Sequence, residues 1–113
     1  LNYANPDMVG HTGDYPAVIK AIETIDVNLK KLVQNALDED YAIIITSDHG
    51  NAEMMKNIDG TPNTAHTTNQ VPCFILNTEN KKISNGRLCD IAPTILSIMD
   101  INQPNEMTGK PLF

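Results

Sequence analysis

The sequence predicts an α/β layered domain, because a long amphipathic helix is followed by two short apolar strands and a second helix. Apolar residues recur at steps of three and four from Pro16 to about Asp38, which predicts the first helix. Residues 41–46 are an apolar run without polar alternation, typical of a strand covered on both faces. Two helices are too few to cover both faces of such a sheet. We therefore expect the rest of the domain to lie outside this chain.

The remaining elements follow from local signals. Residues 1–4 predict a short strand that ends at Asn5, because the residue before a proline is disfavoured in a helix. Residues 51–70 lack apolar periodicity and predict a long loop of the functional or mobile kind. Residues 71–76 predict another strand, and Asp90 is the expected N-cap of a helix that runs to about residue 100. The tail after this helix should be irregular.

Composition excludes several classes of protein. The chain has 113 residues, a net charge of −6 and a pI near 4.8, which argues against nucleic-acid and anionic-membrane partners because these need clustered Lys and Arg. No apolar run approaches the roughly 18 to 20 residues of a membrane helix, and no signal peptide is evident. Cys73 and Cys89 lack metal-site spacing and are typical of reduced thiols. We therefore expect a soluble, cytoplasmic protein.

The first residue is informative in one respect. The chain begins at Leu1 rather than Met, in what looks like the end of a strand. This predicts a fragment of a longer protein.

Five residues with side chains suited to metal ligation occur in three polar segments. They are Asp7, His11, Asp48, His49 and His66. Mixed carboxylate and imidazole ligands suit zinc, manganese or iron, whereas the absence of Cys disfavours a structural zinc site. Five ligands exceed what one four-coordinate ion takes from a protein, so two ions are plausible.

Simpler interpretations stay open for these residues taken one at a time. Asp7 could be a turn former, and His66 could be an ordinary histidine of a surface loop. Asp48 and His49 are the stronger candidates, because they directly follow the apolar strand, and open α/β sheets bind ligands at strand ends. The serines lie in no Gly-x-Ser-x-Gly motif, and Gly-rich phosphate loops are absent. We predict no catalytic residue and no site for an organic cofactor within this chain.

Several longer motifs carry a family resemblance. They are Asn-Pro-Asp-Met-Val-Gly-His-Thr-Gly at 5–13, Ser-Asp-His-Gly-Asn-Ala-Glu at 47–53, Thr-Ala-His-Thr at 64–67, Asp-Ile-Ala-Pro-Thr at 90–94 and Glu-Met-Thr-Gly-Lys at 106–110. Together they resemble the cofactor-independent phosphoglycerate mutases, in the family's order and over nearly the whole chain. Ser47 and Asn63 depart from the residues that the family often has, but neither replaces a ligand.

The resemblance implies a fold and a site. Residues 1–113 would be the carboxyl-terminal portion of the metal-binding phosphatase domain, a fragment of an alkaline-phosphatase-like three-layer domain with a mostly parallel sheet. It implies that Asp7, His11 and His66 bind one divalent ion and that Asp48 and His49 bind a second, with Mn2+ the usual metal. The second site would be incomplete, because the family's further aspartate ligand lies outside this chain.

The resemblance also implies an activity. The family interconverts 2- and 3-phosphoglycerate in glycolysis through a phosphoserine, so phosphoglycerate is the implied small-molecule substrate. The nucleophilic serine and the inserted domain that holds the glycerate lie outside this chain, which should therefore be inactive alone. We expect a monomer. The alternatives are another metalloenzyme of the same superfamily, such as a phosphopentomutase or a phosphodiesterase, and a non-catalytic metal-binding module.

Overall fold

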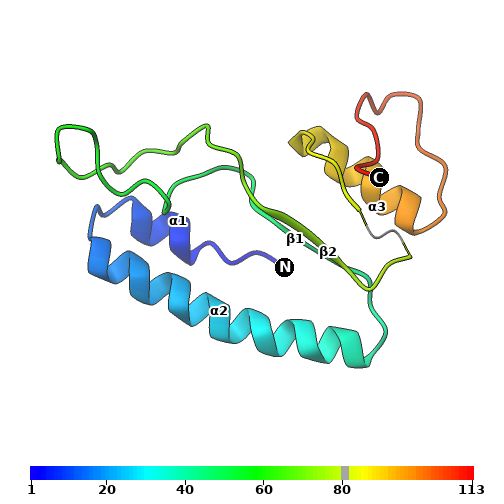
Figure 1. Ribbon diagram of the computed structural model, residues 1–113, viewed down its shortest axis with the longest axis horizontal. Coiled ribbons are helices and arrows are strands. Elements are labelled where there is room, and N and C mark those ends of the chain that lie inside the picture. Colours follow the sequence, from blue (N-terminus) through cyan, green and yellow to red (C-terminus); the bar gives the residue numbers. More distant parts are fainter. Residues whose placement is uncertain (80–81) are drawn as a thin grey trace.

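One long helix, α2 (Tyr15–Asp38), gives the molecule its length (Figure 1). The computed structural model describes residues 1–79 and 82–113, with extents of 47 × 33 × 21 Å. Asp14 caps the helix, because its carboxylate accepts a hydrogen bond from the Ala17 N–H at 3.0 Å, and Pro16 lies in the first turn. The predicted helix from Pro16 to about Asp38 is confirmed.

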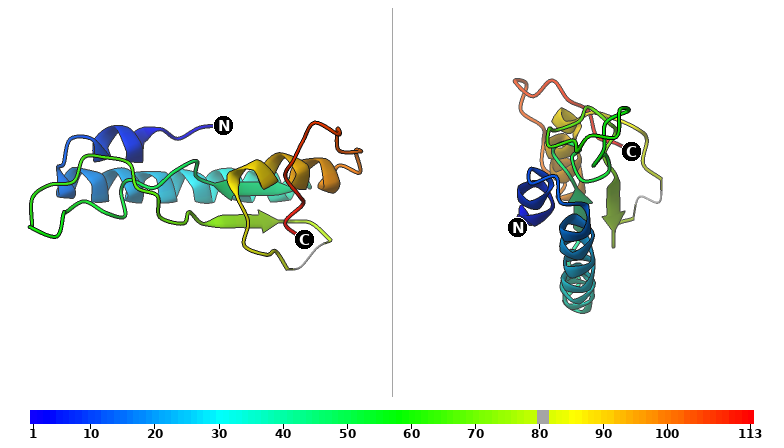
Figure 2. Two further views of the ribbon diagram at one scale, coloured as in Figure 1. Left: turned by 90° about the horizontal axis from the view of Figure 1, so that it is seen from above. Right: turned by 90° about the vertical axis from the view of Figure 1, so that its left-hand side faces the viewer.

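The structure has a short helix where the sequence predicted a loop, and the strand predicted before it is absent. Residues 1–4 form no strand, and α1 spans Asn5–Gly10. The prediction was wrong because Pro6 occupies the first turn of α1, where its missing N–H needs no partner and its fixed φ suits the helix. Gly13, with φ at 71°, then reverses the chain so that α1 packs beside the start of α2 (Figure 2).

Two short strands form an antiparallel pair. They are β1 (Ile43–Thr46) and β2 (Cys73–Leu76), with Ile43 opposite Leu76 and Thr46 opposite Cys73. Both predicted strands are confirmed in shorter form. The pair is antiparallel because residues 47–72 contain no crossover helix and bring the chain back in the opposite direction. The mostly parallel sheet was expected of the whole domain, and two strands do not test it.

This return places both ends of the predicted loop at the same end of the two-stranded sheet. Thr46 donates a hydrogen bond to the Pro72 carbonyl at 3.0 Å, which closes the loop at its base. Between these ends the described backbone has no helix or strand, only turns and the isolated bridges of Gly50 with Thr67 and Lys56 with Pro62, so the predicted long loop is confirmed.

The sheet is less covered than its apolar sequence predicted. Ile43, Ile44 and Ile45 are half-buried, and Phe74 is 55% exposed. The elements that pack on one another are β1 with β2, α1 with α2, and the 3-10 turn η1 (Leu88–Asp90) with α3 (Ile91–Ile98). The helices of this chain therefore supply little of the cover that the strand sequence requires. No helix within the described residues is both long and apolar enough to cross a membrane.

Asp90 holds the carboxyl-terminal part together. It precedes α3 as predicted, but its carboxylate does not cap that helix. Instead it accepts the backbone N–H groups of Lys110 at 2.9 Å and Arg87 at 2.7 Å, which outweigh burial and hold its pKa below the ordinary value. The irregular tail is thereby tied back to the start of α3.

Thr94 makes the second attachment of this tail. Its side chain is fully buried, donates to the Asp90 carbonyl at 2.7 Å and accepts the Leu112 N–H at 3.0 Å. Since Leu112 is itself buried, its N–H has no ready access to water.

We predict that Thr94→Val destabilises the chain by about 1 to 3 kcal/mol, because valine keeps the volume but leaves a buried N–H without an acceptor. Urea unfolding followed by circular dichroism measures the change. Thr24→Val is the matched control, since the Thr24 hydroxyl donates to the Lys20 carbonyl on the exposed surface of α2, and it should change stability by no more than about 0.5 kcal/mol. Equal losses in the two variants would contradict the role given to Thr94.

Candidate metal site

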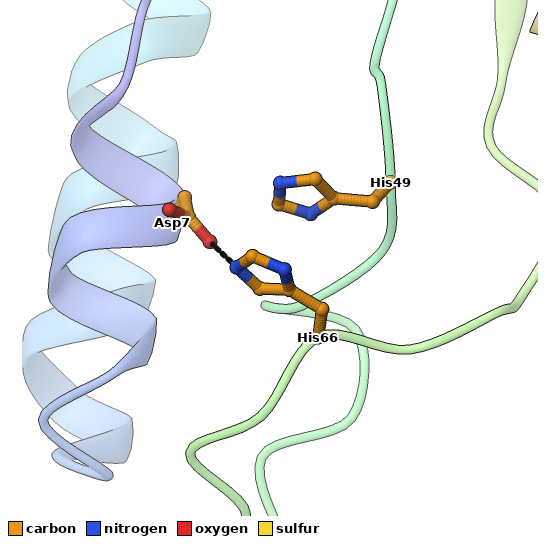
Figure 3. A group of neighbouring side chains, drawn as sticks. All are labelled: Asp7, His49 and His66. Carbon is orange, nitrogen blue, oxygen red and sulfur yellow. Dashed lines mark ion pairs between the residues drawn. The ribbon is translucent and has the colours of Figure 1, made fainter.

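Three segments far apart in the sequence meet beside α1. Asp7 comes from α1, His49 from the chain just after β1, and His66 from the returning half of the loop (Figure 3). The two histidine rings are stacked, with centroids 3.7 Å apart and planes inclined by 18°. One ligand atom from each of the three residues lies within 4.8 Å of the others. These segments therefore form one polar cluster.

His11 completes a tighter group with Asp7 and His66. Asp7 Oδ1 lies 3.0 Å from His66 Nε2 and 3.3 Å from His11 Nε2, and the two nitrogens are 3.1 Å apart. Asp7 and His11 share a face because they are four residues apart on α1 and its C-cap. Ligands that are about 2.0 to 2.2 Å from one ion lie roughly 2.8 to 3.6 Å from each other, from octahedral to tetrahedral coordination. The three atoms are spaced as ligands of a single ion would be.

The hydrogen bonding of His11 favours this interpretation. Its Nδ1 lies 2.6 Å from the Thr64 carbonyl, which can only accept, so Nδ1 carries the proton. When the ring is neutral, Nε2 therefore has no proton, and its lone pair faces the carboxylate of Asp7. Two acceptors that face each other attract a cation between them, and a neutral imidazole held by a carbonyl is the usual form of a metal-ligating histidine.

Asp48 lies at the edge of the cluster. Its side chain is 84% exposed, and its Oδ1 is 3.7 Å from His49 Nε2. Four of the five predicted residues are therefore brought together, whereas Asp48, within the part of the chain that the structure describes, approaches the cluster through its sequence neighbour His49. Ser47 lies close by, but its hydroxyl donates to the His49 carbonyl at 2.7 Å and so supports the backbone.

Asn51 is a member of the site that the sequence did not single out. Its amide donates to Asp7 Oδ1 at 2.7 Å, and its side chain is buried. Gly10 makes this approach possible, because a Cβ at that position would overlap with the Asn51 side chain. The only available signal was the position of Asn51 within the 47–53 motif.

The electrostatics of Asp7 favour its charged form. Burial raises the pKa of the carboxyl, but the Asn51 hydrogen bond and the nearby histidines His11, His66 and His49 outweigh it, so the pKa is lowered. A carboxylate with two or three imidazole nitrogens suits a divalent transition ion more than Mg2+ or Ca2+, which prefer oxygen alone. The cluster is chemically fit for such an ion.

Comparisons with known proteins agree with this chemistry. A family model described as the Metalloenzyme superfamily matches residues 1–103. Two relatives named 2,3-bisphosphoglycerate-independent phosphoglycerate mutase, from Synechococcus sp. and Flavobacterium johnsoniae, are 51% and 56% identical over 100% of this chain. The chain covers 23% and 22% of their lengths, so it spans less than a quarter of each.

A solved structure extends the comparison to the fold. The Leishmania mexicana phosphoglycerate mutase, determined at low cobalt concentration, superposes with a TM-score of 0.85 at 27% identity and covers 99% of this chain and 24% of its own. The similarity confirms the α/β fold class and the resemblance found in the motifs. With a family model that matches residues 1–103 and a cluster suited to a divalent ion, this chain belongs to the metalloenzyme superfamily.

Proposed function

We propose that the chain supplies metal ligands to a two-metal phosphoglycerate mutase, which interconverts 2- and 3-phosphoglycerate through a phosphoserine. The observation that carries the proposal is the triangle of Asp7 Oδ1, His11 Nε2 and His66 Nε2, with sides of 3.0 to 3.3 Å. The relatives' shared name supports the reaction. It also favours a mutase over a phosphopentomutase, a phosphodiesterase or a non-catalytic module.

The five residues divide between two ions in this proposal. Asp7, His11 and His66 hold the first. Asp48 and His49 hold the second, and their 3.7 Å separation across an exposed edge leaves room for ligands from outside this chain. We propose Mn2+ as the metal. The Leishmania mexicana structure was obtained with cobalt, and Co2+ suits the same mixture of oxygen and nitrogen ligands.

The chain's residues prepare the site for phosphoryl transfer. Divalent ions held by these residues would supply positive charge that offsets the negative charge on the transferring phosphoryl group. Asp7 contributes negative charge that Asn51 and the histidines keep ionised. The Thr64 carbonyl orients His11 so that its Nε2 lone pair faces the site. The attacking serine is proposed to lie outside this chain, in a protein that is cytoplasmic and monomeric and acts on free phosphoglycerate.

Calorimetric titration with Mn2+ tests the assignment of the two ions. We predict one tighter and one weaker binding event, because the first ion has three ligands here and the second has two. Asp7→Asn should weaken the tighter event by about 10- to 100-fold, since it removes the charge but keeps the shape.

The matched control is Asp26→Asn, the same chemical change on an exposed position of α2. It should leave both events unchanged. Two tight events of equal affinity in the unmodified chain, or an Asp7→Asn variant with unaltered binding, would refute the assignment.

We predict that the 113-residue chain with Mn2+ shows no turnover of 3-phosphoglycerate above the blank, because it holds metal ligands without the nucleophile. Formation of 2-phosphoglycerate, followed through dehydration by added enolase, measures this. The full-length Flavobacterium johnsoniae relative, assayed in parallel, verifies that the coupled assay responds. Measurable turnover by the chain alone would place a nucleophile within it and overturn the proposal.

A further inference from the structure

The carboxylate of Glu53 lies between the outgoing and returning halves of the loop 47–72. Its Oε2 accepts the Asn51 N–H at 2.7 Å. Its Oε1 accepts the Asn69 side-chain amide at 2.9 Å and a short hydrogen bond from the Thr67 hydroxyl. One side chain therefore bonds the outgoing half through Asn51 and the returning half through Thr67 and Asn69.

The backbone joins the two halves at the same place. The Thr67 N–H donates to the Gly50 carbonyl at 2.8 Å, in an isolated antiparallel bridge. Gly50 is buried, and a Cβ on it would overlap with both Glu53 Oε1 and Thr67 Oγ1. The hydrogen bond between the Thr67 hydroxyl and the Glu53 carboxylate therefore occupies the space that a side chain at position 50 would need. We call the four residues Gly50, Glu53, Thr67 and Asn69 the Glu53 clasp.

The clasp adjoins two of the candidate ligands in sequence. His49 precedes Gly50, and His66 precedes Thr67, so each bridge partner is the direct neighbour of a histidine. The two rings stack at 3.7 Å between centroids. The Gly50–Thr67 bridge therefore holds together the two backbone segments from which the two rings extend.

We propose that Glu53 is a positioning residue, which fixes the separation of His49 and His66, and so of the two proposed metal sites, before the ions bind. The proposal deepens the proposed function and rests on it for the identity of the ligand. Glu53 itself points its carboxylate at Thr67, Asn69 and the Asn51 backbone, so its effect reaches the metal site through the two histidines and through Asn51, whose side-chain amide donates to Asp7.

The chemistry of the clasp requires a carboxylate. All three partners of Glu53 are donors, and an ionised carboxylate offers only acceptors. The Thr67 hydrogen bond is the main cause that lowers the pKa of Glu53, so the charged form persists. A glutamine would have the same shape, but its NH2 group would face a donor on one side of the loop.

The test uses four variants of the chain and Co2+ as the probe, since its visible absorption reports both affinity and coordination. Glu53→Gln removes one acceptor, and Thr67→Val removes the hydroxyl donor at nearly constant volume. Glu53→Gln/Thr67→Val combines them, and Glu23→Gln is the matched control on the exposed surface of α2. The second readout is the nuclear Overhauser effect between the His49 and His66 ring protons without metal.

We expect Glu53→Gln to weaken Co2+ binding about 10- to 100-fold, the usual effect of losing a group that orients metal ligands. Thr67→Val should weaken it in the same direction, and the double variant should lose less than the product of the single losses because the partners are coupled. The ring-to-ring effect should fade in all three while the helical circular dichroism stays constant. Glu23→Gln should match the unmodified chain.

Wild-type Co2+ affinity and an intact ring-to-ring effect in Glu53→Gln would overturn the proposal. If Glu53→Gln loses helical signal, Thr67→Val replaces it in the test. Wild-type Co2+ affinity and an intact ring-to-ring effect in Thr67→Val would then overturn the proposal. If the unmodified chain binds no Co2+, the proposed metal function fails by itself. The ring-to-ring effect then still decides whether Glu53 positions the histidines, because its loss in Glu53→Gln supports positioning and its retention refutes it.

Discussion

A single oxygen atom, Oδ1 of Asp7, lies within reach of nitrogens from all three segments of the site. It accepts from the Asn51 amide at 2.7 Å and lies 3.0 Å from His66 Nε2 and 3.3 Å from His11 Nε2. A carboxylate has enough lone pairs for such partners, and partial burial makes these contacts matter more than they would in water. The arrangement of α1 against the loop depends on these three contacts of Asp7 Oδ1. A divalent ion is the partner that would best balance the negative charge of the carboxylate.

The fold provides this convergence with little apolar core. Val18, Met55 and Leu112 are the buried hydrophobic side chains of the described residues, while Ile22, Val27 and others stay exposed on α2. Polar contacts therefore carry much of the organisation around the site. The antiparallel return of the chain from β1 to β2 is what makes them possible, because it sets the two halves of one loop face to face.

The sequence predicted what depends on long local patterns and missed what depends on contacts across the chain. The periodicity from Pro16 to Asp38 is long enough to determine α2, whereas the six residues of α1 offer less than two turns of pattern. The relative direction of β1 and β2 could not be predicted, since it depends on the path that residues 47–72 take between the two strands. Asp7, His11, His49 and His66 do meet, as their residue types suggested. Asn51 and Glu53 were missed because amides and carboxylates in loops usually contact water, and their partners are distant in sequence.

The central claim is that Asp7, His11 and His66 share one divalent ion. Anomalous diffraction from crystals of the chain grown with Mn2+, recorded above the manganese absorption edge, tests it directly. We expect a strong anomalous peak within about 2.3 Å of Asp7 Oδ1, His11 Nε2 and His66 Nε2. A peak that lies elsewhere, or its absence from this triangle when other sites are filled, would contradict the claim.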